Sequence, residues 1–181
     1  MRLPVFLALL LAAAGAHAAD YTAQAGSTLG FEAQYQGEAI AGKFARFTPA
    51  IRFDPANLAT SRFDVRIDLA SATTGNPDYD GELRGQSFLD SVTRPEARYV
   101  ATRFRALGGN RFVAEGELTL RGVTQPAPLT FTWTAGAQPV LAGEAVLKRL
   151  AFEVGAGEWS DPEVIRDEVK VTTRLVLAPS N

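Results

Sequence analysis

The sequence predicts an all-β domain, folded either as a closed antiparallel barrel or as a sandwich of two sheets. The first observation is a two-residue alternation of apolar and polar side chains, which is clearest in residues 61–70. Apolar residues at 63, 65, 67 and 69 alternate there with charged residues at 62, 64, 66 and 68, as in a strand with one buried and one hydrated face. The second observation is that turn-forming residues separate such stretches at close intervals, which is typical of barrels and sandwiches.

Further alternating stretches predict the other strands. They are residues 29–35, 112–120, 129–133, 141–147 and 169–177. Gly, Pro and Asn occur between several of them and favour hairpin turns at 108–110, 121–126 and 135–139. Residues 43–53 predict one more strand, which Pro49 would divide because proline cannot donate to a sheet ladder. Together the stretches indicate about eight strands.

One stretch between the strands has the start signals of a helix. Asn76 can cap the free N–H groups of a first turn, and Pro77 suits the first helical position. We expect a short helix from Pro77 to about Leu89, which Gly81 and Gly85 would weaken. The residues expected on its inner side are Tyr79, Leu83 and Phe88.

Small residues recur on the faces that the alternation predicts to be buried. A tightly filled sheet would carry Val, Leu or Ile at most of these positions. The small residues either admit large neighbours, such as the phenylalanines, or leave an open lumen. The positions are Ala33, Ala39, Ala114, Gly116, Gly143 and Ala145.

The composition excludes several kinds of function. The chain has 18 Lys and Arg residues, 20 Asp and Glu residues, one histidine and no cysteine. The one histidine is His17, which lies in a segment that the sequence predicts to be cleaved. A mature chain without histidine and cysteine has no basis for Ser-His-Asp or Cys-His catalysis or for a Cys/His zinc site. We therefore predict no catalytic residue and no metal site. The near-neutral charge, without a basic block, argues against nucleic acid as a partner.

The first 18 residues predict a secretory signal peptide. Arg2 gives a charged tip, residues 5–14 form an apolar run, and Ala16-His17-Ala18 is a small-x-small cleavage site. The run is shorter than the roughly 20 apolar residues that a membrane-spanning helix needs. Cleavage would leave residues 19–181 as a single exported domain, with no histidine and no transmembrane segment.

Several charged and aromatic groups have both a functional and a structural interpretation. The acids at 78–82 lack the spacing of a calcium loop and suit a helix start, whereas those at 158–168 suit a cation site or a charged loop. Arginines at 94, 98, 103, 105 and 111 could meet an anionic head group or face solvent. Trp133 and Trp159 could line an apolar site or fill the core.

Three stretches of the sequence have a distinctive order and spacing. They are Asp80 to Asp90 (DGELRGQSFLD), Glu117 to Pro126 (ELTLRGVTQP), and Phe152 to Val169 with Trp159 between them. Together they resemble the YceI family of periplasmic lipid- and polyisoprenoid-binding proteins, over Tyr21 to Leu177. The resemblance implies an extended, eight-stranded, antiparallel, lipocalin-like barrel with a short helix between strands. Its apolar lumen would hold a polyprenyl compound or a quinone tail, and the small residues would leave space there.

The resemblance also implies that apolar side chains of the inner faces contact the isoprenoid. The ligand-binding residues that we expect are Phe31, Tyr35, Phe44, Ile67, Phe88, Leu89, Phe104, Phe131 and Trp133. Tyr99 and Arg103 are candidates for contacts with a polar head group. Two positions depart from the family pattern, since Glu82 stands where many relatives have histidine and Ala101 where many have serine. These departures leave the identity of the head group open.

Three functions fit the sequence. The leading hypothesis is a periplasmic carrier or reservoir for an isoprenoid lipid, which needs no catalytic group and no cofactor besides a bound lipid or quinone. The alternative is a secreted accessory of a membrane b-type cytochrome or respiratory chain, and a lumen filled by side chains would favour it. The third is an enzyme that acts on a lipid, for which a buried acid facing the lumen would be the evidence.

Two structural questions also stay open at this stage. The alternation does not say which face points inward, and transmembrane barrels have polar lumens and apolar exteriors. The resemblance places the charges outside. The sequence does not decide whether the barrel forms a homodimer.

Overall fold

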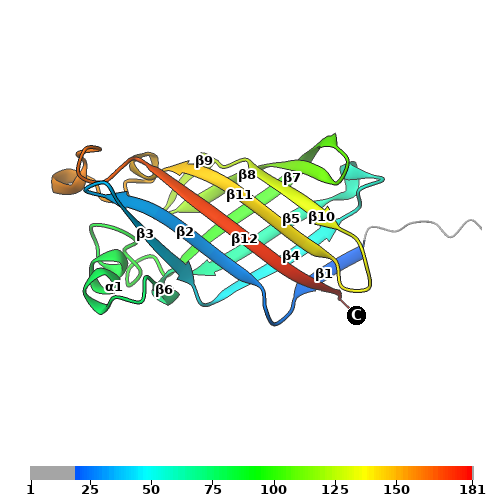
Figure 1. The fold of residues 1–181 in the computed structure, drawn as a ribbon, viewed down its shortest axis with the longest axis horizontal. Helices are drawn as coiled ribbons and strands as arrows, with labels where there is room; N and C mark the ends of the chain where they lie inside the picture. Colours follow the sequence, from blue (N-terminus) through cyan, green and yellow to red (C-terminus); the bar gives the residue numbers. More distant parts are fainter. Residues whose placement is uncertain (1–18, 181) are drawn as a thin grey trace, which may run out of the picture.

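The computed structural model describes residues 19–180, which form an elongated barrel with one short helix (Figure 1). The signal peptide predicted in residues 1–18 lies outside the described residues. The strands are β1 Ala19–Ala23, β2 Thr28–Tyr35, β3 Glu38–Phe44, β4 Phe47–Phe53, β5 Arg62–Asp68, β6 Ala72–Thr73, β7 Glu96–Gly108, β8 Arg111–Leu120, β9 Val123–Pro126, β10 Leu129–Thr134, β11 Val140–Lys148 and β12 Glu168–Pro179. The helices are α1 Pro77–Arg84 and the 3₁₀ turns η1 Leu58–Thr60, η2 Leu69–Ser71, η3 Arg149–Phe152 and η4 Gly157–Trp159.

These strand segments combine into eight long strands. β1 and β2 both pair with β12. On their other side, β4 pairs with β1 and β3 pairs with β2. Beyond these, β5 pairs with β4 and β6 pairs with β3. β9 and β10 likewise both pair with β8. When each interrupted pair counts as one strand, every strand is antiparallel to the next, and the last closes on the first. The predicted eight-stranded antiparallel barrel is therefore confirmed for the described part of the chain.

The interruption expected at Pro49 lies elsewhere. Pro49 is buried inside β4 and pairs with Val65 of β5. β1 pairs only with residues 50–53 of β4, so at Pro49 the strand has a neighbour on one side alone and tolerates a residue without an N–H. The chain breaks instead between β3 and β4, where Ala45 N–H donates to Ser71 O over 3.1 Å.

Helix α1 begins where the sequence predicts and ends five residues earlier. The Asn76 side chain accepts a hydrogen bond from the Asp78 N–H over 3.0 Å, and Pro77 fills the first position. The helix ends at Arg84 because Gly85 takes an extended conformation with φ −67° and ψ 170°. Residues 86–91 then turn back, and Leu89 N–H bonds to Leu83 O over 3.0 Å.

The buried carboxylate of Asp80 joins α1 to the barrel. It accepts hydrogen bonds from the Thr73 hydroxyl over 2.6 Å and from the N–H of Thr74 over 2.6 Å. These hydrogen bonds hold the pKa of Asp80 below its ordinary value, and the one from Thr73 has the largest effect. The helix is thereby fixed over the end of the barrel that lies opposite the chain terminus (Figure 1).

An aromatic plug fills the terminal end of the barrel. Its residues are Phe53, Phe63, Phe104, Phe112, Phe131 and Trp133. Phe53 stands at the centre, with its ring centroid 4.9 Å from that of Trp133 and 5.0 Å from that of Phe112. Tyr21 of β1 meets Trp133 edge to face at 5.5 Å, which places the plug near the chain ends.

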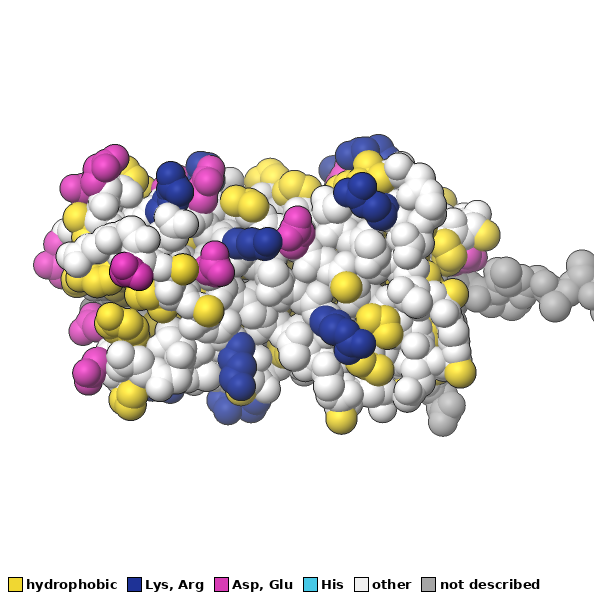
Figure 2. All heavy atoms as spheres, in the orientation of Figure 1, with side chains coloured by type: hydrophobic (Ala, Val, Ile, Leu, Met, Phe, Trp, Pro, Cys, Tyr) yellow, Lys and Arg dark blue, Asp and Glu magenta, His cyan; other side chains and the backbone are white. Residues whose placement is uncertain are grey.

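The charged faces of the strands point outward, and Figure 2 shows Lys, Arg, Asp and Glu side chains on the surface of the barrel. On β5 the Asp64 carboxylate accepts hydrogen bonds from Arg98 over 2.6 Å and from Arg62 over 3.1 Å. The hydrogen bond from Arg98 is the largest of the effects that lower the pKa of Asp64 to about 2. The apolar residues of the same strand face the interior, as the resemblance implies. Within residues 19–180, no helix has the length and apolar character that crossing a membrane requires.

Candidate functional site

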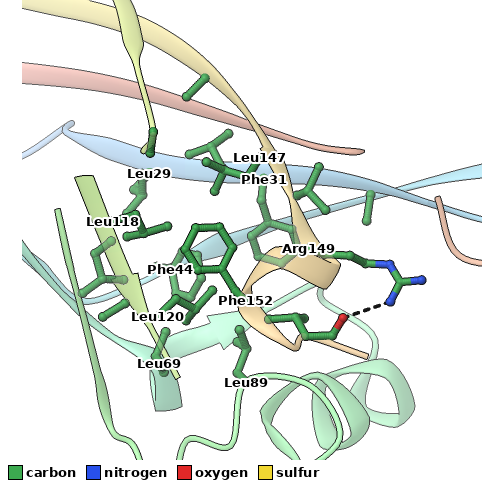
Figure 3. A pocket seen from close by; sticks show the side chains of 18 of the residues that line it. Leu29, Phe31, Phe44, Leu69, Leu89, Leu118, Leu120, Leu147, Arg149 and Phe152 are labelled. Atoms are coloured by element: carbon green, nitrogen blue, oxygen red, sulfur yellow. Dashed lines mark hydrogen bonds between the residues drawn. The ribbon is translucent and has the colours of Figure 1, made fainter. Parts of the chain in front are cut away.

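An apolar cavity occupies the barrel between the aromatic plug and helix α1. The cavity volume is about 410 Å³, which lies within the range of about 300–1,000 Å³ typical of small-molecule sites. Figure 3 shows leucine and phenylalanine side chains converging on this space from several strands and from η3. The labelled examples are Leu29, Phe31, Phe44, Leu69, Leu89, Leu118, Leu120, Leu147 and Phe152.

The walls of the cavity follow from the two-residue alternation of the strands. On β2 the lining residues are Leu29, Phe31, Ala33 and Tyr35, with Gln34 added at the rim. On β12 they are Val169, Val171, Thr173 and Leu175. Each set lies on one face of its strand, and the alternate residues point to solvent. The predicted apolar lumen is thus built from the same residues whose spacing predicts the strands.

The mouth of the cavity lies at the α1 end and is more polar than the walls. We define the mouth by the polar, aromatic or exposed lining residues from the end of β2, the β6–α1 connection, α1 and η4. They are Gln34, Tyr35, Thr74, Tyr79, Glu82 and Trp159. Tyr79 is 44% exposed, and Glu82 is also exposed, so solvent reaches the cavity from this side.

Six of the nine expected ligand contacts line the cavity. These are Phe31, Tyr35, Phe44, Ile67, Phe88 and Leu89. The other three, Phe104, Phe131 and Trp133, belong to the aromatic plug and do not line it. The seven that belong to strands lie on inward faces, because alternation identifies the face but not the depth at which the barrel fills, whereas Phe88 and Leu89 lie in the turn after α1. Whether the six contact a lipid stays a prediction.

The two candidates for head-group contacts lie on opposite sides of the wall. Tyr99 lines the cavity, and its hydroxyl donates to Ala114 O over 3.3 Å. Burial raises the pKa of Tyr99 well above its ordinary value, so the phenol is neutral. The Arg103 side chain is 80% exposed on the outer surface, 3.7 Å from Glu115. The expectation for Arg103 is wrong because the pairing of β7 with β8 shifts register between Ala101 and Phe104.

The small residues serve both purposes that the sequence leaves open. Ala33 and Ala145 line the cavity and leave space in it. Gly116 instead admits a ring, since a Cβ there would lie 2.3 Å from Tyr99. Ala114 is fully buried in the plug cluster, and Gly143 lies against Phe131. Ala39 departs from the expectation, because it is exposed on the outer face of β3.

A buried arginine organises the loop beside the mouth. All five N–H groups of the Arg149 guanidinium donate to main-chain oxygens, at 2.7 to 3.2 Å. The acceptors are the carbonyls of Val154, Gly155, Trp159, Ile165 and Arg166. Figure 3 shows the guanidinium pointing away from the apolar side chains. Arg149 therefore fixes the 153–167 loop and has no N–H left for a ligand.

Several lining residues were absent from the sequence-based set. Leu118, Leu120 and Leu147 follow the alternation of β8 and β11, and that signal could have identified them. Phe152 and Val154 follow strand β11 in an irregular segment without period, so no local signal places them. Their positions depend on the bonds that Arg149 makes.

The chemistry of the lining is that of an apolar binding site. Glu82 and Arg149 are the charged residues among those that line the cavity, and Glu82 is exposed at the mouth. The buried acids Asp54, Asp80 and Asp90 do not line it. Across residues 19–180, no three His, Cys, Asp or Glu side chains are grouped as a metal site requires. The arrangement can hold a long apolar molecule by burying it.

Comparison with known proteins agrees with this architecture. A family model, the YceI-like domain, matches residues 21–177. A UPF0312 protein of Vibrio campbellii is 28% identical over 170 residues, which cover 86% of this chain and 90% of that protein. A UPF0312 protein of Photorhabdus laumondii is 34% identical over 126 residues, which cover 67% of this chain and 65% of that protein.

Solved structures share the fold. The crystal structure of BcnA from Burkholderia cenocepacia matches with a TM-score of 0.79 and 31% identity, covering 83% of this chain and 95% of BcnA. A domain from Saccharophagus degradans, described as polyisoprenoid binding, matches with a TM-score of 0.69 and 18% identity, covering 91% of this chain and all of that domain. On the extent of the family match and the BcnA likeness, the chain belongs to the YceI-like family.

Proposed function

We propose that this protein binds a long isoprenoid lipid, a polyprenyl compound or a prenylated quinone, in the lumen of its barrel. The observation that carries the proposal is a deep apolar cavity that opens at the α1 end and is closed at its other end by the aromatic plug. The lipid would enter tail first, because the polar residues lie at the mouth. The family membership and the Saccharophagus domain, which is described as polyisoprenoid binding, support the choice of ligand class.

Burial of the tail would supply the affinity. Each buried CH₂ group contributes about 0.8 kcal/mol, so a five-carbon isoprene unit contributes at most about 4 kcal/mol. Loss of motional freedom and ordering of the flexible tail offset part of this gain. The proposed role is therefore binding and carriage, for which the cavity needs shape and apolar surface and no reactive group.

The mouth favours an uncharged head group. Gln34, Thr74 and Tyr79 offer neutral hydrogen-bonding groups there. Glu82 carries a carboxylate at the same rim, whereas the N–H groups of Arg149 are already bonded to main-chain oxygens. The exposed Arg166 does not line the cavity and donates to the Gln34 side chain over 3.2 Å. A quinone can accept hydrogen bonds at such a rim and an alcohol can both accept and donate them, while a phosphate would meet a like charge.

We place the protein in the periplasm, on the basis of the signal peptide predicted in residues 1–18. Fractionation of cells that express the full chain should recover a shortened protein beginning near Ala19 in the periplasm. A chain lacking residues 2–18 should stay in the cytoplasm. Recovery of the full-length, uncleaved protein in the cytoplasm would contradict the proposal of export.

The open cavity favours a lipid-binding role over the alternative of an accessory protein. A lumen filled by side chains would favour an accessory of a membrane b-type cytochrome or respiratory chain, whereas this lumen holds a cavity of about 410 Å³. Neither the described residues nor the comparisons support a cytochrome partner or a homodimer. The proposal is one of binding and not of catalysis. A buried acid facing the lumen would favour an enzyme, and the buried acids Asp54, Asp80 and Asp90 of the described residues do not line the cavity.

Mass spectrometry of organic extracts from gently purified protein tests the proposal. We expect an isoprenoid lipid, near one molecule per protein, and reloading of the emptied barrel by a prenylquinone or a polyprenol. An Ala145→Phe variant should lose the lipid because Ala145 lines the cavity, whereas Val146→Phe on the outer face should retain it. An empty barrel in repeated preparations, together with no uptake of either lipid, would refute the proposal.

A further inference from the structure

We infer that the aromatic plug limits the length of isoprenoid tail that the barrel buries to about four isoprene units. The inference rests on the proposed function, because it concerns the same cavity. It adds a length limit, set by named residues at the closed end. The limit follows from the tightness of the plug, the depth of the cavity above it and the length of one isoprene unit.

The plug is packed too tightly for a hydrocarbon chain to pass. Phe53, Phe63 and Phe131 are at most 2% exposed. The ring centroid of Phe53 lies 5.2 Å from that of Phe131 and 6.0 Å from that of Phe63, and the Phe63 and Phe131 centroids are 5.4 Å apart. These are the separations of aromatic rings in contact. A tail that reaches this layer must stop or fold back.

The floor of the cavity and the upper surface of the plug share the same side chains. Ile51, Phe63, Leu141 and Leu175 line the cavity and belong to the buried cluster around the plug. Phe112 belongs to that cluster without lining the cavity. The end of the available space is therefore defined by specific residues, and Phe63 and Phe112 lie on its two sides.

The register of β2 and β12 gives the depth. Leu29 pairs with Thr173, so Leu175 lies two residues nearer the plug than Leu29, while Tyr35 at the mouth lies six residues the other way. Eight residue steps of about 3.3 Å span about 26 Å along the strands. Strands in such barrels tilt by about 40° from the axis, which leaves a depth of about 20 Å.

The length of an isoprene unit converts this depth into a tail length. Each unit adds four main-chain bonds, which at about 1.5 Å and near-tetrahedral angles extend a chain by about 5 Å. A depth of about 20 Å therefore accommodates about four units. Carbons of an extended tail beyond that number remain outside the mouth, and they add little buried area.

A chain-length series tests the limit. The probes are triethylene glycol ethers of prenols with two, three, four, five and six isoprene units, measured below their micelle concentrations by calorimetry. The affinity should rise at least tenfold with each unit up to about four units, because each added carbon is buried. Each unit beyond that number should change the affinity by less than threefold.

Substitutions on the two sides of the floor provide the matched comparison. Phe63→Val opens the floor. The affinity should then keep rising for about one isoprene unit more before it reaches a plateau, which is the tail length beyond which added units no longer improve binding. Phe112→Val removes a similar volume behind the floor and should leave the plateau at about four units. If Phe63→Val fails to fold, as thermal melting would show, Leu141→Ala opens the same floor by a smaller change and replaces it.

The outcomes separate the inference from the proposed function. A plateau near four units that moves with Phe63→Val or Leu141→Ala supports the inference. A tenfold gain in affinity with each unit through six units, or a plateau that stays at the same tail length in the floor variants, overturns the length limit and leaves lipid binding intact. Failure of every probe to bind would refute the proposed function itself.

Discussion

Replacing Arg149 by methionine should destabilise the protein and loosen the loop beside the mouth. The arginine is 4% exposed, and its five hydrogen bonds reach main-chain oxygens between Val154 and Arg166. Methionine would keep the apolar stem but leave the five oxygens without this donor, and those of Gly155 and Ile165 belong to buried residues. Each unpaired buried oxygen costs about 1 kcal/mol or more, and removal of the buried cation returns part of the cost of its desolvation.

The net loss in unfolding free energy should be about 3–5 kcal/mol. Since 1 kcal/mol corresponds to about 2–4 °C in a protein of this size, Tm should fall by about 10 °C. Arg149→Lys has fewer donors and should recover only part of the loss. Arg166→Met is the control, because Arg166 is exposed and makes one side-chain hydrogen bond in this structure, to Gln34 over 3.2 Å.

Chemical denaturation and hydrogen exchange measure the two effects separately. Denaturation should give the loss in free energy, and exchange should speed up in residues 153–167 before it does so in the strands. A loss below 1 kcal/mol in Arg149→Met, or unchanged exchange in that loop, would show that water satisfies the carbonyls equally well. The role assigned to Arg149 would then be wrong.

Three further predictions concern pH, packing and the head group. The folded state holds the pKa of Asp64 near 2 through Arg98, so this carboxylate stabilises the fold above about pH 4 and the contribution disappears as pH falls towards 2. Because the pair is on the surface, we expect a contribution of about 1 kcal/mol. In an acid titration the Arg98→Met variant should lose part of this contribution, since Arg62 still donates to Asp64. Gly116→Ala should cost about 1–3 kcal/mol in urea unfolding, because its Cβ would overlap the Tyr99 ring, whereas Gly136→Ala, with open space around it, should cost little. In 20 mM salt a prenyl diphosphate should bind about tenfold more weakly than the alcohol of equal length, because its charge meets the like charge of Glu82 at the mouth. In 300 mM salt the difference in affinity should be smaller, because salt screens the repulsion. Equal affinities at low salt would contradict this prediction.

Local patterns in the sequence were enough to predict the strands and much of the cavity wall. The alternation in β2 and β5 places Phe31, Tyr35 and Ile67 on inward faces because a strand has only two faces to choose from. Asn76 and Pro77 likewise predict the start of α1, since capping depends on adjacent residues. Both kinds of signal act within a few residues, so a single chain is enough to detect them.

Features that depend on distant contacts were not predicted. The helix ends at Arg84 because the following turn bonds back to it, and Arg103 faces outward because β7 shifts its register against β8. The main-chain oxygens around Arg149 come together only when η3, η4 and β12 are in place. In each case the decisive partner lies outside the local pattern that the sequence displays.

The division of the lumen into plug and cavity is the clearest example, and it bears directly on function. Phe31 and Phe131 have the same residue type and both lie on inward faces, yet Phe31 lines the cavity and Phe131 is 1% exposed in the plug. The difference arises from their neighbours. Phe131 meets Phe53, Phe63 and Phe112 from other strands, whereas the ring of Phe31 covers Gly42 and leaves space beyond it. The capacity of the barrel therefore depends on which rings meet across it, and changes at Phe63 should alter tail length without altering the fold.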